Sequence, residues 1–169
     1  MTAPFPGVRD TFSATAISGD TVIVGARYDD RPTGNDTGSA FVVVRSGNAW
    51  VQQATLTAPD GVRFDGFGTV VAIDGDTAVI GASIMASDGG GANPTITYVF
   101  QRTAGAWAFQ ERIDAPNFSD VFISDNHSLA LQGDTLVVGA SGDDTNPGDD
   151  AGSVRIYAAS AHRGPCRPG

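Results

Sequence analysis

The sequence is poor in the residues that build disulfides and histidine metal sites. Its 169 residues include one cysteine, Cys166, and two histidines. A single thiol excludes an intrachain disulfide, and two histidines are too few for a histidine-built metal site. No trio of nucleophile, base and orienting acid converges in the pattern, so no catalytic residue is predicted.

Membrane-spanning segments, export signals and positive charge are also scarce. No apolar run reaches the roughly 18 residues of a membrane helix, and Met1–Pro6 lacks the basic start and apolar core of a secretory signal. Ten Lys and Arg against 19 Asp and Glu give a formal net charge of −9. This balance argues against nucleic acid and anionic membrane surfaces, and it suits divalent cations.

What the chain does have is a nine-residue phrase that occurs three times. It begins at glycine-containing turns about 57 residues apart and covers Ser18–Ala26, Asp74–Ala82 and Gln132–Ala140. A fixed period of this length is typical of a repeat architecture. Trp50 and Trp107 occupy equivalent positions in the first two units, which favours packing between units over a ligand platform.

Each unit predicts four short strands. In unit two these are Gly68–Ile73, Thr77–Ala82, Thr97–Gln101 and Trp107–Ile113. Asp74-Gly75 predicts a tight hairpin, because glycine tolerates the positive φ of a primed turn. The second strand is apolar on both faces, whereas the fourth alternates between apolar and polar residues. Burial that decreases from the second strand to the fourth is expected in a propeller blade, from the central axis to the rim. The turn acids Asp20, Asp76 and Asp134 are expected to bond backbone N–H groups within their turns.

We therefore expect an all-β fold, a partial β-propeller of about three four-stranded antiparallel blades with the last blade incomplete. Residues 1–160 form one repeat domain, with blades at about 10–57, 64–114 and 118–158 and a disordered tail at 161–169. Three blades fall short of the four or more of a closed ring. The chain is then a fragment of a larger propeller, or half of a symmetric pair, with open edges that favour self-association.

The second unit resembles the FG-GAP repeat. The resemblance rests on Phe67-Gly68, on Val71–Ser83, and on the Asp- and Gly-rich loop and aromatic strand that follow. FG-GAP repeats build β-propellers, including the head of integrin α subunits and many bacterial surface or secreted proteins. The resemblance therefore implies an extracellular or cell-envelope setting, although the chain shows no signal peptide. The Phe-Gly pair is intact only in unit two.

Calcium is the one cofactor that the sequence suggests. The connection Asp74–Thr77 is too short for the integrin calcium loop, but the loops between second and third strands carry paired acids and amides. Oxygen ligands on a glycine-containing loop suit this cation. The predicted calcium ligands are Asp29, Asp30, Asn35 and Asp36 in the first loop, and Asp143, Asp144, Asp149 and Asp150 in the third. The alternative interpretation is a solvated turn, since Asp, Asn, Gly and Pro are also the commonest turn residues.

The predicted function is non-enzymatic: a blade array that displays loops to a protein or glycan, as the FG-GAP resemblance implies. Two alternatives stay open. One is a lyase or hydrolase propeller whose site is completed by blades outside this chain. The other is a non-functional gene remnant.

Overall fold

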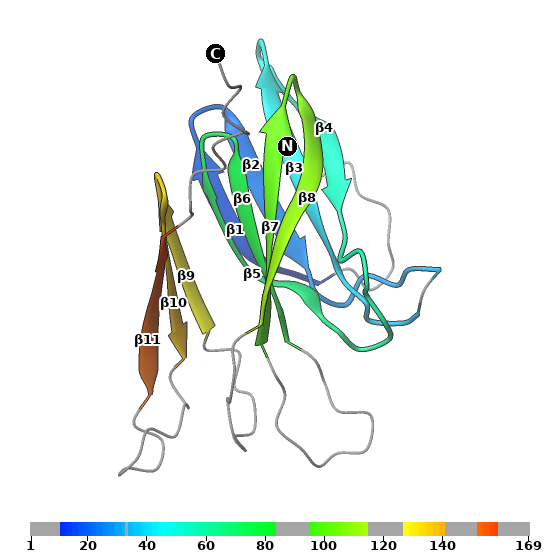
Figure 1. Cartoon of the computed structure of the whole chain (residues 1–169). Helices are drawn as coiled ribbons and strands as arrows, with labels where there is room; N and C mark the ends of the chain where they lie inside the picture. The colour runs from blue at the N-terminus through cyan, green and yellow to red at the C-terminus, as the bar shows by residue number, and fades with distance from the viewer. Residues whose placement is uncertain (1–10, 33, 84–94, 115–126, 141–151, 159–169) are drawn as a thin grey trace, which may run out of the picture.

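A computed structural model of the chain describes residues 11–32, 34–83, 95–114, 127–140 and 152–158. These residues form three antiparallel sheets with strands in sequence order (Figure 1). The first sheet contains β1 (Phe12–Ser18), β2 (Thr21–Ala26), β3 (Ser39–Ser46) and β4 (Ala49–Leu56). The second contains β5 (Phe67–Asp74), β6 (Thr77–Ser83), β7 (Thr95–Thr103) and β8 (Ala106–Asp114). The third contains β9 (His127–Gln132), β10 (Thr135–Ala140) and β11 (Ser153–Ala158).

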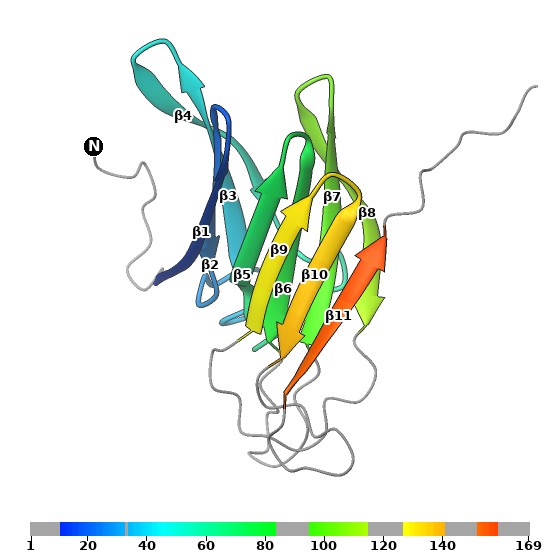
Figure 2. The same cartoon turned by 90° about the vertical axis from the view of Figure 1, so that its left-hand side faces the viewer.

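The architecture confirms the predicted fold class, with sheets of four, four and three strands in the described residues. Figure 2 shows the sheets arranged side by side, as the blades of a propeller are, and they are called blades one, two and three below. The described part of the chain holds no helix, and so none of a length and hydropathy that could cross a membrane. The predicted domain limits and the predicted tail at 161–169 involve residues outside those described.

The first hairpin of every blade turns at the predicted glycine. Gly19, Gly75 and Gly133 have φ of +54°, +55° and +53°. These values lie in the left-handed region, where a residue without a Cβ has no steric penalty. The turn of blade two also ties it to blade one, because Gly75 N–H donates to Ser18 Oγ at 3.0 Å. The turn of blade three repeats this bond, with Gly133 N–H donating to Asp74 Oδ2 at 2.6 Å.

The core lies between neighbouring blades rather than within one sheet. The largest cluster joins blades one and two and contains Ile23, Val42, Phe67, Ile80 and Tyr98 among its buried members. A second, smaller cluster joins blades two and three through Ala72, Val79, Leu136 and Val138. Successive residues of β6 therefore enter different cores, Val79 towards blade three and Ile80 towards blade one. This explains why β6 is apolar at consecutive positions.

Phe67 and Gly68 hold blade two against blade one at very short range. A Cβ on Gly25 would overlap the carbonyl oxygen of Gly68, and a Cβ on Gly38 would overlap that of Phe67. Two backbones can approach this closely only where side chains are absent. The Phe67 ring is fully buried, and its centroid lies 5.4 Å from that of Tyr98. The Phe-Gly pair of the repeat is thus a wedge between blades.

We expect Gly25→Ala to lower the free energy of unfolding by about 3 kcal/mol, because the methyl group must push the Gly68 backbone out of the interface. Gly47→Ala is the matched control. Its φ of +60° makes alanine unfavourable, but a Cβ there meets nothing within 4 Å, so the cost is about 1 kcal/mol. Urea unfolding of both variants measures the difference, and equal losses would show that the close approach is unimportant.

Candidate functional site

The loop between β2 and β3, Arg27–Gly38, is ordered by its own hydrogen bonds. Arg31 and Gly34 exchange two backbone hydrogen bonds of 3.0 and 2.9 Å. The N–H of Gly38 donates to the carbonyl oxygen of Asp29 at 3.0 Å, which closes the base of the loop. Thr37 Oγ1 donates to the carbonyl oxygen of Gly34 at 2.8 Å. The loop is therefore a structured surface and not a loose connection.

The four predicted calcium ligands of this loop have structural partners. Asp29 Oδ2 accepts a hydrogen bond from Ser39 Oγ at 2.6 Å and lies 2.8 Å from an Arg31 guanidinium nitrogen. Asp30 Oδ1 accepts the Asp36 N–H at 3.0 Å. The main-chain oxygens of Asn35 and Asp36 accept the N–H groups of Phe64 and Gly66, both at 3.1 Å. The loop thus supports the segment that leads into the Phe67-Gly68 wedge.

Two residues in this region have the left-handed backbone conformation, Asp36 at φ +53° and Phe64 at +71°. Non-glycine residues adopt it uncommonly, aspartate more readily than phenylalanine, and a bulky residue such as Phe64 needs support from its surroundings. Here the paired backbone bonds between the loop and residues 64–66 provide that constraint.

Within the described ranges, no three His, Cys, Asp or Glu side chains are grouped to hold an ion. Asp143, Asp144, Asp149 and Asp150 lie outside the described residues. Calcium binding at the two loops stays a prediction, as do the enzymatic and remnant alternatives.

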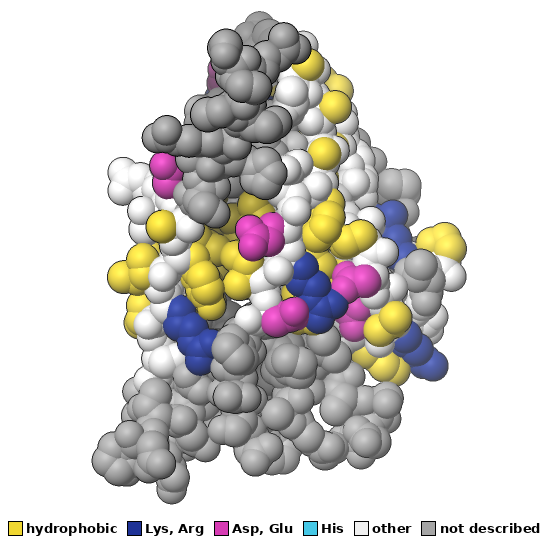
Figure 3. Space-filling view, viewed as in Figure 1, with side chains coloured by type: hydrophobic (Ala, Val, Ile, Leu, Met, Phe, Trp, Pro, Cys, Tyr) yellow, Lys and Arg dark blue, Asp and Glu magenta, His cyan; other side chains and the backbone are white. Residues whose placement is uncertain are grey.

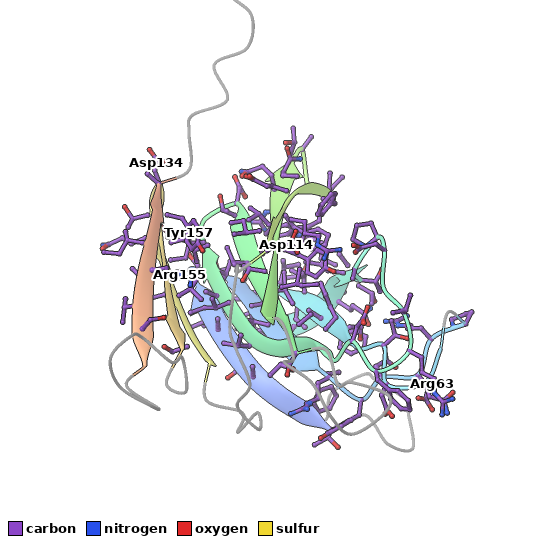
Figure 4. All side chains as sticks on the ribbon, turned by 60° about the horizontal axis from the view of Figure 1, so that its bottom comes forward. Arg63, Asp114, Asp134, Arg155 and Tyr157 are labelled. Atoms are coloured by element: carbon purple, nitrogen blue, oxygen red, sulfur yellow. The ribbon has the colours of Figure 1, made fainter. Side chains whose placement is uncertain are left out.

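A polar network lies beside this loop end of the sheets. Tyr98 Oη donates to Asp60 Oδ1 at 2.9 Å, and Arg112 bonds both Asp60 and Asp114. Burial alone would raise the pKa of Asp60, but the hydrogen bonds from Tyr98 and Arg112 outweigh it and hold the pKa below its usual value. Burial raises the pKa of the neighbouring Asp65, despite a backbone hydrogen bond from Val62. Figure 3 shows acidic and basic side chains gathered on this face, and Figure 4 marks Asp114 there.

At the opposite end of the sheets, blades one and two carry the same three-residue unit. Arg45 Nε lies 2.9 Å from Asp20 Oδ1, and its guanidinium stacks 4.7 Å from the Trp50 ring. In blade two, Arg102 Nε lies 2.6 Å from Asp76 Oδ1 and its guanidinium 5.1 Å from the Trp107 ring. Each arginine lies between the turn aspartate and the indole ring. It forms an ion pair with the aspartate and a cation–π contact with the ring.

This unit corrects one expectation from the sequence. Asp20 and Asp76 do not use their side chains to bond N–H groups of their own turns; their carboxylates pair with arginines on the third strand. The main-chain oxygens of both aspartates accept the N–H of the same arginines. The recurrence of Arg45 and Arg102 beside the tryptophans was the signal in the sequence that could have indicated this pairing.

In blade two the same unit also contacts blade one. Arg102 Nη1 donates to Thr21 Oγ1 at 3.0 Å, and Trp107 Nε1 donates to Gln53 Oε1 at 2.9 Å. Gln53 is the extra residue of a β-bulge in β4, since its neighbours Gln52 and Ala54 pair with successive residues of β3. A bulge re-aims its side chain. Packing of Trp107 between blades is therefore confirmed, with Gln53 as its acceptor. For Trp50 it stays a prediction, because the described residues place only Arg45 of its own sheet against the ring.

A comparison with protein-family models identifies the repeat. The model described as FG-GAP repeat matches residues 8–43, 50–100 and 119–157, which together make up more than half of the chain. The chain belongs to the FG-GAP repeat family. A search of curated proteins returned no match to it. In this FG-GAP chain the signature residues Phe67-Gly68 and Gly25-Ala26 are the ones that meet at the junction of blades one and two.

We expect Trp107→Ala to lower the free energy of unfolding by about 3 kcal/mol, because it removes packing against the main core and the shorter of the two hydrogen bonds that Gln53 Oε1 accepts. Trp50→Ala is the matched control. Trp50 has the same stacked arginine but no partner blade among the described residues, so its loss costs about 1 kcal/mol. Thermal melts compare the two. Equal destabilisation would contradict a role between blades.

Tyr98→Phe keeps the ring that packs on Phe67 but removes the hydrogen bond to Asp60. We expect a loss of about 1–2 kcal/mol at pH 7, because a bond to a charged acceptor is removed. The folded-state pKa of Asp60 lies below its unfolded value, so this stability is present above the unfolded pKa and is lost as pH falls through the folded pKa. The difference between wild type and variant should therefore shrink towards pH 3, as measured by urea unfolding. A constant difference would show that Asp60 is not the relevant partner.

Proposed function

We propose that this FG-GAP repeat domain is a non-enzymatic binding module. It presents the loops between its second and third strands to a protein or glycan partner outside the cell. The extracellular setting is the one in which the FG-GAP resemblance places such repeats. The net charge of −9 favours partners other than nucleic acid.

One observation carries the proposal: the second strands of all three blades finish at the same end of the sheets. The first hairpin turns of all three blades meet at one end, where the Gly75 and Gly133 N–H groups each bond the preceding blade. The second strands β2, β6 and β10 start at these turns and therefore end at the opposite end (Figure 2). Binding residues on loops at one end of a rigid scaffold are typical of recognition domains.

The described loop offers a mixed surface at that end. Asp30 and Asn35 are exposed, and so are Val62 and Arg63 of the adjoining segment. The Arg63 backbone lies directly against Gly34, and its guanidinium stacks 4.3 Å from the Phe64 ring. Figure 4 shows Arg63 at the edge of this surface. This surface combines the guanidinium of Arg63, the carboxylate of Asp30, the amide of Asn35 and the apolar side chain of Val62. Such a mixture can bind peptide groups or sugar hydroxyls.

The test is binding of the purified chain to arrays of glycans and of extracellular matrix proteins, followed by titration of any ligand found. We expect Arg63→Ala to weaken that ligand about tenfold without changing the melting temperature. Asn48→Ala, an exposed change in the β3–β4 turn at the other end, is the control and should bind normally. Absence of any ligand at about 100 µM, or equal weakening by both variants, would contradict the proposal.

A further inference from the structure

A groove of about 560 Å³ lies between blades two and three, beside the first hairpin turn of blade three. Leu131, Leu136 and Tyr157 give it an apolar wall on blade three. Figure 4 shows Tyr157 on the side of that blade that faces blade two. The polar residues that line the groove correspond, through the repeat, to residues that bind an arginine side chain at the other junction.

At the junction of blades one and two, the guanidinium of Arg102 has four acceptors. Blade two supplies Asp76 Oδ1, 2.6 Å from Nε, and the carbonyl oxygen of Gly75, 3.3 Å from Nη2. Blade one supplies Thr21 Oγ1 and Gln53 Oε1, which lie 3.0 and 3.4 Å from Nη1. Two blades thus bind one planar group whose N–H donors have fixed directions.

Blade three presents two of the four corresponding acceptors to the groove. Asp134 and Gly133 occupy in its first turn the positions that the aspartate and the glycine occupy in blade two, and both line the groove. The arginine is not repeated, because the position that corresponds to Arg102 is Ala159. In the part of the chain that the structure describes, no ion pair engages the Asp134 carboxylate.

Blade two presents the other two acceptors. Thr77 begins β6 and pairs with β7, as Thr21 begins β2 and pairs with β3. Gln110 is the extra residue of a bulge in β8, as Gln53 is in β4. Thr77 Oγ1 donates to Gln101 Oε1 at 3.0 Å, so its own oxygen can still accept a hydrogen bond. All four acceptors of a guanidinium therefore have counterparts in this groove.

The ionised residues of the groove favour a cation. Its charged lining consists of Glu111, Asp134 and Arg112, which is two carboxylates against one guanidinium. The Arg112 guanidinium bonds Asp60 and Asp114, which places its charge on the side of blade one. Because successive residues of a strand point to opposite faces, Glu111 points to the groove instead. The carboxylates thus outweigh the positive charge inside the groove.

We propose that this groove binds a small organic cation that carries a guanidinium group on an aliphatic arm. The guanidinium lies between Asp134 and Thr77 and donates to Gln110 Oε1 and to the carbonyl oxygen of Gly133, which repeats the contacts of the arginine at the other junction. The arm lies along the apolar wall of blade three, in a groove whose volume suits a small molecule.

This site lies beside the hairpin turns, at the opposite end of the sheets from the loops of the proposed function. It uses none of the residues on which that proposal depends. The two proposals can therefore fail independently of each other.

The probe is agmatine, titrated into the full chain and measured by calorimetry. We expect a dissociation constant of about 0.1–1 mM and a rise in the melting temperature at saturation. Putrescine has the same carbon arm with an ammonium group in place of the guanidinium. It should bind at least about tenfold more weakly, because an ammonium is a point charge without the planar fork of donors.

Two substitutions of exposed side chains locate the site on the protein. Gln110→Ala and Asp134→Ala should each weaken agmatine about fivefold, while the melting temperature of the free chain stays unchanged. Gln52→Ala and Asp20→Ala are the matched controls, since they remove the same kinds of side chain outside the groove. Both control variants should bind agmatine like wild type.

Three results with these compounds and variants would overturn the proposal. They are no heat of binding up to about 10 mM agmatine, equal affinity for putrescine, and equal weakening by the control variants. Acetyl-arginine amide presents the same guanidinium as a polypeptide would and separates the two sources of this group. If it binds and agmatine does not, the groove accepts an arginine side chain of a protein, and the small-molecule assignment is wrong.

Discussion

The arrangement of the blades depends on one close backbone approach. The Gly68 backbone lies against Gly25, and the Phe67 backbone lies against Gly38. No side chain fits at Gly25 or at Gly38. This contact places the Phe67 ring in the core beside Tyr98 and Phe100, where the aromatic rings meet at tilted and edge-on angles. It also brings the segment before β5 within reach of the loop carbonyls of Asn35, Asp36 and Thr37. The structured loop, the polar network at Asp60 and the large core all adjoin this junction.

The two junctions between blades are unequal in the described residues. Both share the bond from a turn glycine to the preceding blade and an apolar cluster. Only the junction of blades one and two adds the glycine contact and the arginine–tryptophan unit. Equivalent acceptors on blade two, Thr77 and Gln110, instead border a groove. One repeat sequence thus produces one tightly filled junction and one that leaves polar and apolar groups accessible.

Much of the fold could be predicted from the sequence because its signals are local and occur three times. The turn glycines, the strand periods and the buried β6 all follow from backbone preferences and from alternation along one strand. The partners of side chains between blades could not be predicted in this way. The turn motif predicts that Asp76 bonds its own turn, but it pairs with Arg102, and the role of Gln53 depends on a β-bulge that no local sequence signal marks. These contacts depend on how one sheet lies against the next, which no single strand encodes.

At the candidate site, too, the sequence predicts which residues are present but not which partners their side chains have. The paired acids and amides of the first loop were identified from composition, but Asp29 and Asp30 are already engaged by Arg31, Ser39 and a backbone N–H. An isolated sequence cannot distinguish a carboxylate that shapes a loop from one that awaits a cation, since both require the same residues.

Blade three exposes apolar side chains on its outer side. Val154 and Ile156 of β11 are 68% and 72% exposed, and the strand turns its other side chains towards blade two. With a small shared cluster on one side and water on the other, this blade gains less from burial than blades one and two gain from each other. We therefore expect its native contacts to open at a lower free energy than those of the paired blades, so that blade three can detach while blades one and two stay folded.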